Sequence, residues 1–270
     1  MEQNDYAVPD EYKVSRARLQ TITQAQAYHL ILRKNGKKPG CQSGITSTNI
    51  EIAQDEILRT TEWKPSEKLL WKSLDNITLK ISDLIWKIIH NCIKCGSFFQ
   101  YIQDLQDRQY CPCGEIESIE HILLYCKKYQ ISQMWTEIET IWTQSSSSPW
   151  IPPTKGVIMG IGTVKIRKEE KLLQIETKRY ITFITESIWN VWKLRNQRIF
   201  EETEYDKNVL INKWKTQMQE KIQRDFNIIK LKSYSQHEME YTNFKSLWCQ
   251  RKTLANLKGD SDPLLEICIT

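Results

Sequence analysis

Residues 111–126 read CPCGEIESIEHILLYC and hold three of the eight cysteines and one of the four histidines of the chain. Thiolates and a neutral imidazole are ligands that a tetrahedral zinc ion prefers, and the four-residue gap between His121 and Cys126 is usual for small zinc modules. The candidate ligands are therefore Cys111, Cys113, His121 and Cys126. The alternative is that these are ordinary buried residues, since free cysteine is among the most buried residue types.

The first two cysteines of this motif are unusually close. Only Pro112 separates Cys111 from Cys113, whereas zinc modules generally have two to four residues there. Both sulfurs can reach one ion only through a tight turn, which Gly114 assists because it allows a positive φ. If the turn keeps one sulfur away, the alternatives are a three-ligand site with water or a site completed by Cys95.

The second half of the motif predicts a short helix. Ser118 is a candidate N-cap for a helix that runs from residue 119 towards residue 126. Residues five apart on an α-helix point about 140° away from each other. We therefore expect this helix to end or distort near Tyr125, so that Cys126 can turn back to the ion.

Composition and charge indicate an ordinary folded protein. Of the 270 residues 40% are hydrophobic and 26% are charged, and a net charge of +5 permits nucleic-acid contact without requiring it. No run of eighteen apolar residues exists, and residues 1–5 lack a signal-peptide pattern. We expect an intracellular protein, with the nucleus included, that neither spans a membrane nor is secreted. In that reducing setting the cysteines should bind metal or stay free.

Apolar residues recur at three- and four-residue steps through most of the chain and predict an all-α fold, a multi-helix array with a small CCHC zinc-knuckle insertion. Long helices are expected over 71–92, with a break near residues 75 and 76, and over 169–202. A CxxC at Cys92 and Cys95 ends the first of these, and we expect Cys92 to be a core position. The serines and prolines of 144–153 predict a linker. The expected domains are a helical segment at 1–64, a zinc-binding domain at 65–143, a linker at 144–168 and a helical domain at 169–270.

The most basic long segment is the best candidate for a nucleic-acid face. Residues 165–200 hold nine basic and four acidic residues, an excess that equals that of the whole chain. Lys and Arg side chains bind phosphates with little dependence on sequence. The candidate residues are Lys178, Arg179, Lys193, Arg195 and Arg198. Arg195 has an alternative role, because an arginine just after Trp192 can stack on that ring or cap the helix end.

Four segments together carry a family resemblance: IWKIIHN at 85–91, the motif at 113–126, Trp135, and ESIWNVWKLRN at 186–196. They resemble the zinc-binding region that follows the reverse transcriptase in LINE-like (non-LTR) retrotransposons, especially the fungal versions. The resemblance is specific over 71–142 and moderate over 175–200. It implies a Zn2+ ion on Cys111, Cys113, His121 and Cys126, although the family usually has two residues between the first two cysteines. The implied partners are RNA or DNA, bound weakly and without sequence preference, and a reverse transcriptase.

The residues needed for catalysis are not found in the sequence. A polymerase holds two metal ions on paired aspartates, and no Asp-Asp pair occurs in this chain. A retroviral-type RNase H needs carboxylates on a sheet, and no sheet is predicted. Four protein ligands would also fill the coordination of a zinc ion and leave no position for a reactive water. We expect no enzyme activity. The alternative function is a helical docking module, or a decayed retroelement remnant, without nucleic-acid affinity.

Overall fold

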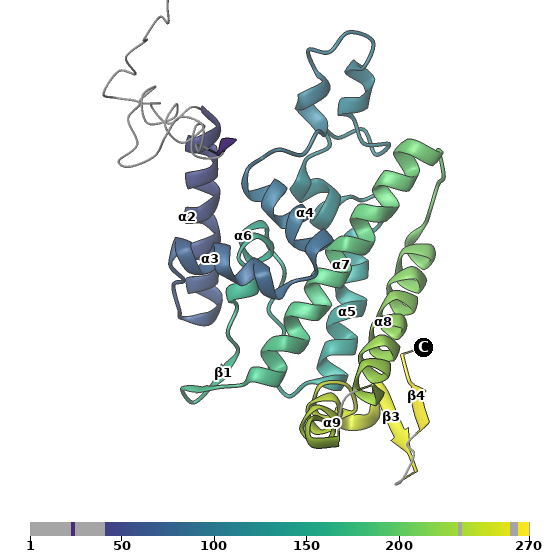
Figure 1. The fold of residues 1–270 in the computed structure, drawn as a ribbon. Helices are drawn as coiled ribbons and strands as arrows, with labels where there is room; N and C mark the ends of the chain where they lie inside the picture. The colour runs from purple at the N-terminus through teal and green to yellow at the C-terminus, as the bar shows by residue number, and fades with distance from the viewer. Residues whose placement is uncertain (1–22, 25–40, 232–233, 260–263, 270) are drawn as a thin grey trace, which may run out of the picture. The chain divides into compact units, whose positions relative to one another are not determined.

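The computed structural model describes residues 23–24, 41–231, 234–259 and 264–269 (Figure 1). The chain divides into two compact units, residues 1–45 and 46–270. Of the helical segment expected at 1–64, residues 1–22 and 25–40 lie outside the described residues.

The described residues are mostly helical, which confirms the predicted all-α class. Among them, strands occur in two two-stranded antiparallel sheets. The helices are α2 (Cys41–Thr61), α3 (Glu67–Ser73), α4 (Leu79–Ile89), α5 (Ile131–Ser145), α6 (Lys155–Met159), α7 (Gln174–Glu201), α8 (Lys207–Lys230) and α9 (Tyr234–Trp248). In the described part of the chain no helix is long and apolar enough to cross a membrane.

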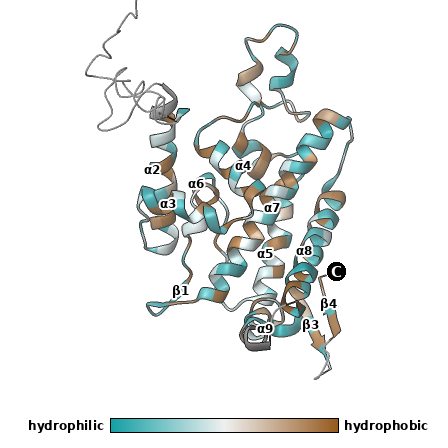
Figure 2. Ribbon diagram, in the orientation of Figure 1, coloured by the Kyte–Doolittle hydropathy of each residue, from teal (hydrophilic) through white to brown (hydrophobic). Residues whose placement is uncertain are grey.

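The helix α7 lies at the centre of the unit and contacts both α8 and α9, while α5 also contacts α8 (Figure 1). Apolar and hydrophilic residues alternate along α7 and α8 (Figure 2), as expected for helices that bury one side. Aromatic rings join these helices: Phe183 of α7 lies 5.8 Å from Trp142 of α5 and 5.8 Å from Trp214 of α8, measured between ring centroids. All three side chains are buried, so this aromatic group forms the middle of the core.

The predicted break in the 71–92 helix is present. Ser66 caps α3 by accepting a hydrogen bond from the Leu69 N–H, and a 3-10 turn at Leu74–Asn76 separates α3 from α4. The helix α4 ends at Ile89, three residues before Cys92. Cys92 is exposed, so its expected core position is wrong.

The expected linker at 144–168 is packed into the core of this unit. It contains α6 and a 3-10 turn at Ile161–Thr163, and Val157, Ile158 and Ile161 are buried. Its glycines explain the close packing: a Cβ at Gly162 would lie 2.5 Å from the Ser73 Oγ of α3. The serines and prolines therefore mark a turn between packed elements, and residues 46–270 form one compact unit.

Two short hairpins were missed by the periodicity argument. Strands β1 (Arg167–Lys168) and β2 (Lys171–Leu172) precede α7, which begins at Gln174 and not at residue 169. Strands β3 (Ala255–Lys258) and β4 (Leu264–Ile267) pair after α9. Strands of two to four residues are too short to show a convincing alternation of apolar and polar positions.

Candidate metal centre

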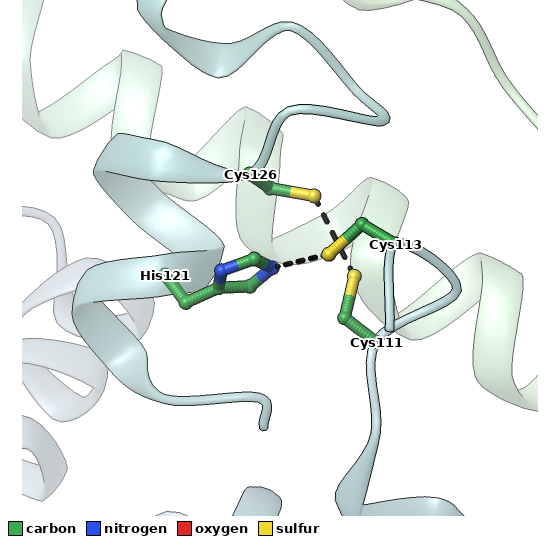
Figure 3. A group of neighbouring side chains, drawn as sticks. All are labelled: Cys111, Cys113, His121 and Cys126. Carbon is green, nitrogen blue, oxygen red and sulfur yellow. Dashed lines mark hydrogen bonds between the residues drawn. The ribbon is translucent and has the colours of Figure 1, made fainter. Parts of the chain in front are cut away.

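A tight hairpin carries the first two cysteines. The Cys111 N–H donates to the Glu115 carbonyl and the Gly114 N–H donates to the Cys111 carbonyl, each at 2.8 Å. Tyr110 and Ile116 pair as an antiparallel bridge at the base of the hairpin. Gly114 has a φ of +88°, a conformation that side chains with a Cβ rarely adopt. The turn brings the Cys111 and Cys113 sulfurs towards the same point despite their one-residue separation (Figure 3).

A π-helical turn carries the other two residues. It spans His121–Tyr125, and the Cys126 N–H donates to the His121 carbonyl at 2.9 Å, a bond across five residues. The Ser118 Oγ accepts from the His121 N–H at 3.0 Å, as an N-cap does. A bond across five residues closes a wider turn than an α-helix has and brings the first and last residues into line. This distortion is the one that the sequence required near Tyr125.

The four side chains converge at one place (Figure 3). The Cys111 and Cys126 sulfurs are 3.5 Å apart, and the Cys113 sulfur is 3.3 Å from the His121 Nε2. All four ligand atoms lie within 4.8 Å of one another. Cys111, His121 and Cys126 are buried, and Cys113 is half-buried. This arrangement can hold a metal ion.

Glu115 lies beside the histidine, outside the cluster. Its carboxylate lies 3.4 Å from the His121 Nδ1, on the opposite edge of the ring from the Nε2 that faces Cys113. Metal-bound histidines commonly donate their second ring N–H to a carboxylate, which fixes the tautomer. Glu115 was not among the residues predicted from the sequence, although its place between the cysteines and the histidine was a usable signal.

The surrounding hydrogen bonds favour a thiolate at Cys126. A hydrogen bond from Cys111 lowers the pKa of Cys126, and the backbone N–H groups of Lys128 and Tyr129 lower it further. The same sulfur–sulfur bond, together with burial, raises the pKa of Cys111. A metal ion needs thiolate ligands, so its binding would release the proton of Cys111.

The remaining cysteines near this segment are outside the cluster. Cys92 is exposed and Cys95 is half-buried. Burial raises the pKa of Cys95 to about 11, so its thiol stays protonated at neutral pH. Neither residue belongs to the group of converging ligand atoms.

Glu117 connects the hairpin to α7. Its side chain is 1% exposed and forms ion pairs with Arg195 and with Arg198, the latter at 2.6 Å between Oε1 and Nη2. Both arginines were expected at a nucleic-acid face, and this prediction is wrong for them in the present conformation because their guanidinium groups neutralise a buried carboxylate. Arg195 also lies 5.2 Å from the Trp192 ring, the alternative that the sequence suggested.

Arg179 is likewise misplaced by the sequence argument, because it is fully buried. Its guanidinium donates to the Ser145 carbonyl of α5 at 2.9 Å, and to the Leu247 and Ser246 carbonyls of α9 at 2.8 and 2.7 Å. Glu176, one turn earlier on α7, balances its charge at 3.2 Å. Arg179 joins three helices and is inaccessible to a phosphate.

Two of the five candidate nucleic-acid residues remain accessible. Lys178 and Lys193 are exposed on α7. Partial burial lowers the pKa of Lys193, and the neighbouring charge of Lys80 lowers it further. The nearby carboxylates of Glu186 and Glu220 oppose this effect.

Comparison with protein-family models, with curated proteins and with solved structures found no match.

Proposed function

We propose that Cys111, Cys113, His121 and Cys126 bind one zinc ion. Tetrahedral zinc, with Zn–S near 2.3 Å and Zn–N near 2.05 Å, places two sulfurs about 3.8 Å apart and a sulfur and a nitrogen about 3.6 Å apart. The corresponding separations of 3.5 and 3.3 Å are close to these values. Three sulfurs and one imidazole are also a donor set typical of structural zinc and atypical of magnesium or calcium.

The role of the ion is structural. Of residues 90–120, all described, the single buried apolar side chain is Cys111. A segment with so little apolar burial has few means of offsetting the conformational entropy lost on ordering, whereas metal coordination supplies folding free energy directly. Four protein ligands complete a tetrahedral shell, so the proposal includes no zinc-bound water and no hydrolytic activity.

The protein is then a non-catalytic accessory module that binds nucleic acid. The support is the resemblance to the zinc-binding region that follows the reverse transcriptase of non-LTR retrotransposons, together with the net charge of +5. The phosphate-binding residues are the exposed lysines, among them Lys178 and Lys193, because Arg179, Arg195 and Arg198 stabilise the fold. A reverse transcriptase is the proposed protein partner.

One observation favours a second candidate, docking onto a protein. The segment around the metal hairpin exposes large apolar side chains, at 52% for Ile116 and 57% for Tyr125. Others of this kind are Phe98, Tyr101 and Tyr110. Exposed apolar groups of this size are common at protein interaction sites.

Metal content and salt-dependent binding test both parts of the proposal. Untagged protein should contain one zinc per chain. Its affinity for single-stranded RNA or DNA should fall linearly with salt on a log–log plot, since phosphate contacts release counterions. Zinc-loaded protein with no affinity at low salt would refute the nucleic-acid role and leave docking as the function.

A further inference from the structure

A groove of about 670 Å³ runs beside α7 within residues 46–270. Lys178, Thr182, Thr185 and Glu186 of α7 line one wall, and Trp63 and Lys165 line another part. Grooves of this size hold a small molecule or a short segment of a polymer. The groove is separate from the metal cluster and shares no residue with it.

Lysines mark the groove as a site for anions. Lys165 lies over the Trp63 ring, 3.6 Å from its centroid, and Lys178 is exposed. No ion pair joins either lysine to a described acidic residue within 4 Å, whereas Lys221 at the same groove pairs with Asp225 at 2.5 Å. Two lysines are therefore available to a ligand phosphate.

A row of positions along α7 leads from the groove to a second exposed lysine, Lys193. Positions 178, 182, 185, 189 and 193 follow one another at steps of three or four residues and so share one face of the helix. The Nζ of Lys80, a residue of α4, lies over the ring of Trp189 on this face, 5.3 Å from the ring centroid. Lys193 is exposed one turn further along α7. The face thus places lysines at both ends of a path of about 22 Å, given a rise of 1.5 Å per residue.

Glu186 indicates what kind of anion fits. It is 7% exposed, lines the groove, and forms no ion pair with a described basic residue within 4 Å. The Gln217 Nε2 donates to its Oε2 at 2.5 Å. A polyanion without hydrogen-bond donors would be repelled by this carboxyl group, because both carry negative charge. Nucleic-acid bases with amino groups instead offer donors, as cytosine N4 and adenine N6 do.

We propose that this groove binds a segment of single-stranded RNA or DNA, with phosphates at Lys165, Lys178 and Lys193 and an amino-bearing base edge at Glu186. The inference rests on the proposed function, since it assigns the place where nucleic acid binds. A single strand fits better than a duplex because its bases are unpaired and can turn their edges into a groove.

The test compares two triple variants of the zinc-loaded full chain. One is Lys165→Ala/Lys178→Ala/Lys193→Ala; the control, Arg224→Ala/Lys230→Ala/Lys252→Ala, removes the same charge from outside the groove. Each single-strand phosphate contact contributes about 0.7 to the salt exponent, or about fivefold in affinity near 0.1 M salt. Labelled twelve-nucleotide strands should therefore bind the groove variant about a hundredfold more weakly, while the control should stay within about threefold of the parent protein.

The outcomes separate this inference from the proposed function. A parent protein that binds no strand refutes nucleic-acid binding itself. A parent that binds, with equal losses in both triple variants, overturns only the groove. If circular dichroism shows that the groove variant is misfolded, Lys178→Glu replaces it, because this exposed side chain supports no packing. An affinity of Lys178→Glu equal to that of the parent protein would contradict the proposal.

A further substitution, Glu186→Gln, tests the base contact. It should reduce a preference for oligocytidine over oligothymidine, since an amide both donates and accepts hydrogen bonds. An equal preference in Glu186→Gln and in the parent protein would remove Glu186 from the site.

Discussion

Glu117 shows how one residue can determine whether the metal hairpin stays attached to α7. Its buried carboxylate forms ion pairs with two arginines of α7, which lie about eighty residues later in the chain. Breaking a buried ion pair by removing one partner leaves the other charge uncompensated, and this generally costs more than the pair contributed.

Substituting Glu117 should therefore destabilise the protein strongly. We expect Glu117→Gln to lower the free energy of unfolding by about 3–5 kcal/mol, because Arg195 and Arg198 lose their carboxylate. The matched control is Glu120→Gln, an exposed residue of the same segment, which should change stability by less than about 0.5 kcal/mol. Denaturant unfolding measures the free energy of unfolding of both variants. Equal losses would show that the buried ion pairs of Glu117 do not stabilise the protein.

Single ligand substitutions should separate the four-residue metal site from its alternatives. Cys126→Ser and His121→Ala should abolish stoichiometric zinc, and Cys111→Ser should weaken its binding. Cys95→Ser is the matched control and should bind one zinc, because Cys95 lies outside the cluster. Zinc measured after dialysis decides the outcome; loss of metal in Cys95→Ser would favour a site completed by that residue.

The sequence predicted the metal cluster but not the burial of the arginines, because only partners that are close along the chain can be recognised from sequence spacing. Cys111, Cys113, His121 and Cys126 lie within sixteen residues, so local spacing was enough to group them. The partner of Arg195 lies 78 residues away, and a one-dimensional charge count cannot reveal it. A basic segment in sequence is therefore a poor guide to a basic surface wherever buried carboxylates take up the charge.

At the scale of elements, Arg179 is the clearest case of one helix holding others. It satisfies carbonyls at the C-terminal ends of α5 and α9, where a helix leaves its last carbonyls without intrahelical donors. Apolar periodicity predicted the all-α class, because helices that pack on one another each bury one stripe. It could not predict the π-helical turn, which is defined by the bond between the Cys126 N–H and the His121 carbonyl.

Arg179→Ala should loosen the packing of α5 and α9 against α7. The change leaves Glu176 buried without its ion-pair partner and leaves three backbone carbonyls without their hydrogen-bond donor. We therefore expect a loss of about 3–5 kcal/mol in the free energy of unfolding. The adjacent exposed residue gives the control, since Lys178→Ala should stay within about 0.5 kcal/mol of the parent protein. Thermal unfolding followed by circular dichroism distinguishes them, and similar melting temperatures would contradict this role for Arg179.

At the scale of the whole molecule, the described part of residues 46–270 is one compact unit with an unevenly distributed core. Buried apolar side chains are frequent in α4, α5, α7 and α8 and scarce between residues 90 and 120. The linker predicted at 144–168 is a packed segment. Its composition could not reveal this, because serine and proline are common both in packed turns and in linkers.

Removing the metal should therefore act locally. After chelation, amide hydrogen exchange should accelerate over residues 92–126, while α5, α7 and α8 keep their protection, since their stability comes from the aromatic core. Exchange that accelerates equally throughout the protein would mean that the ion supports the entire fold. Exchange that does not change anywhere would mean that the hairpin is ordered without it.

X-ray absorption at the zinc edge of the purified protein tests the metal site most directly. We predict a first shell of three sulfurs near 2.3 Å and one nitrogen near 2.0–2.1 Å, from Cys111, Cys113, Cys126 and His121. Protein without zinc, or zinc surrounded only by oxygen and nitrogen, would contradict the account and leave these residues as buried thiols beside a core histidine.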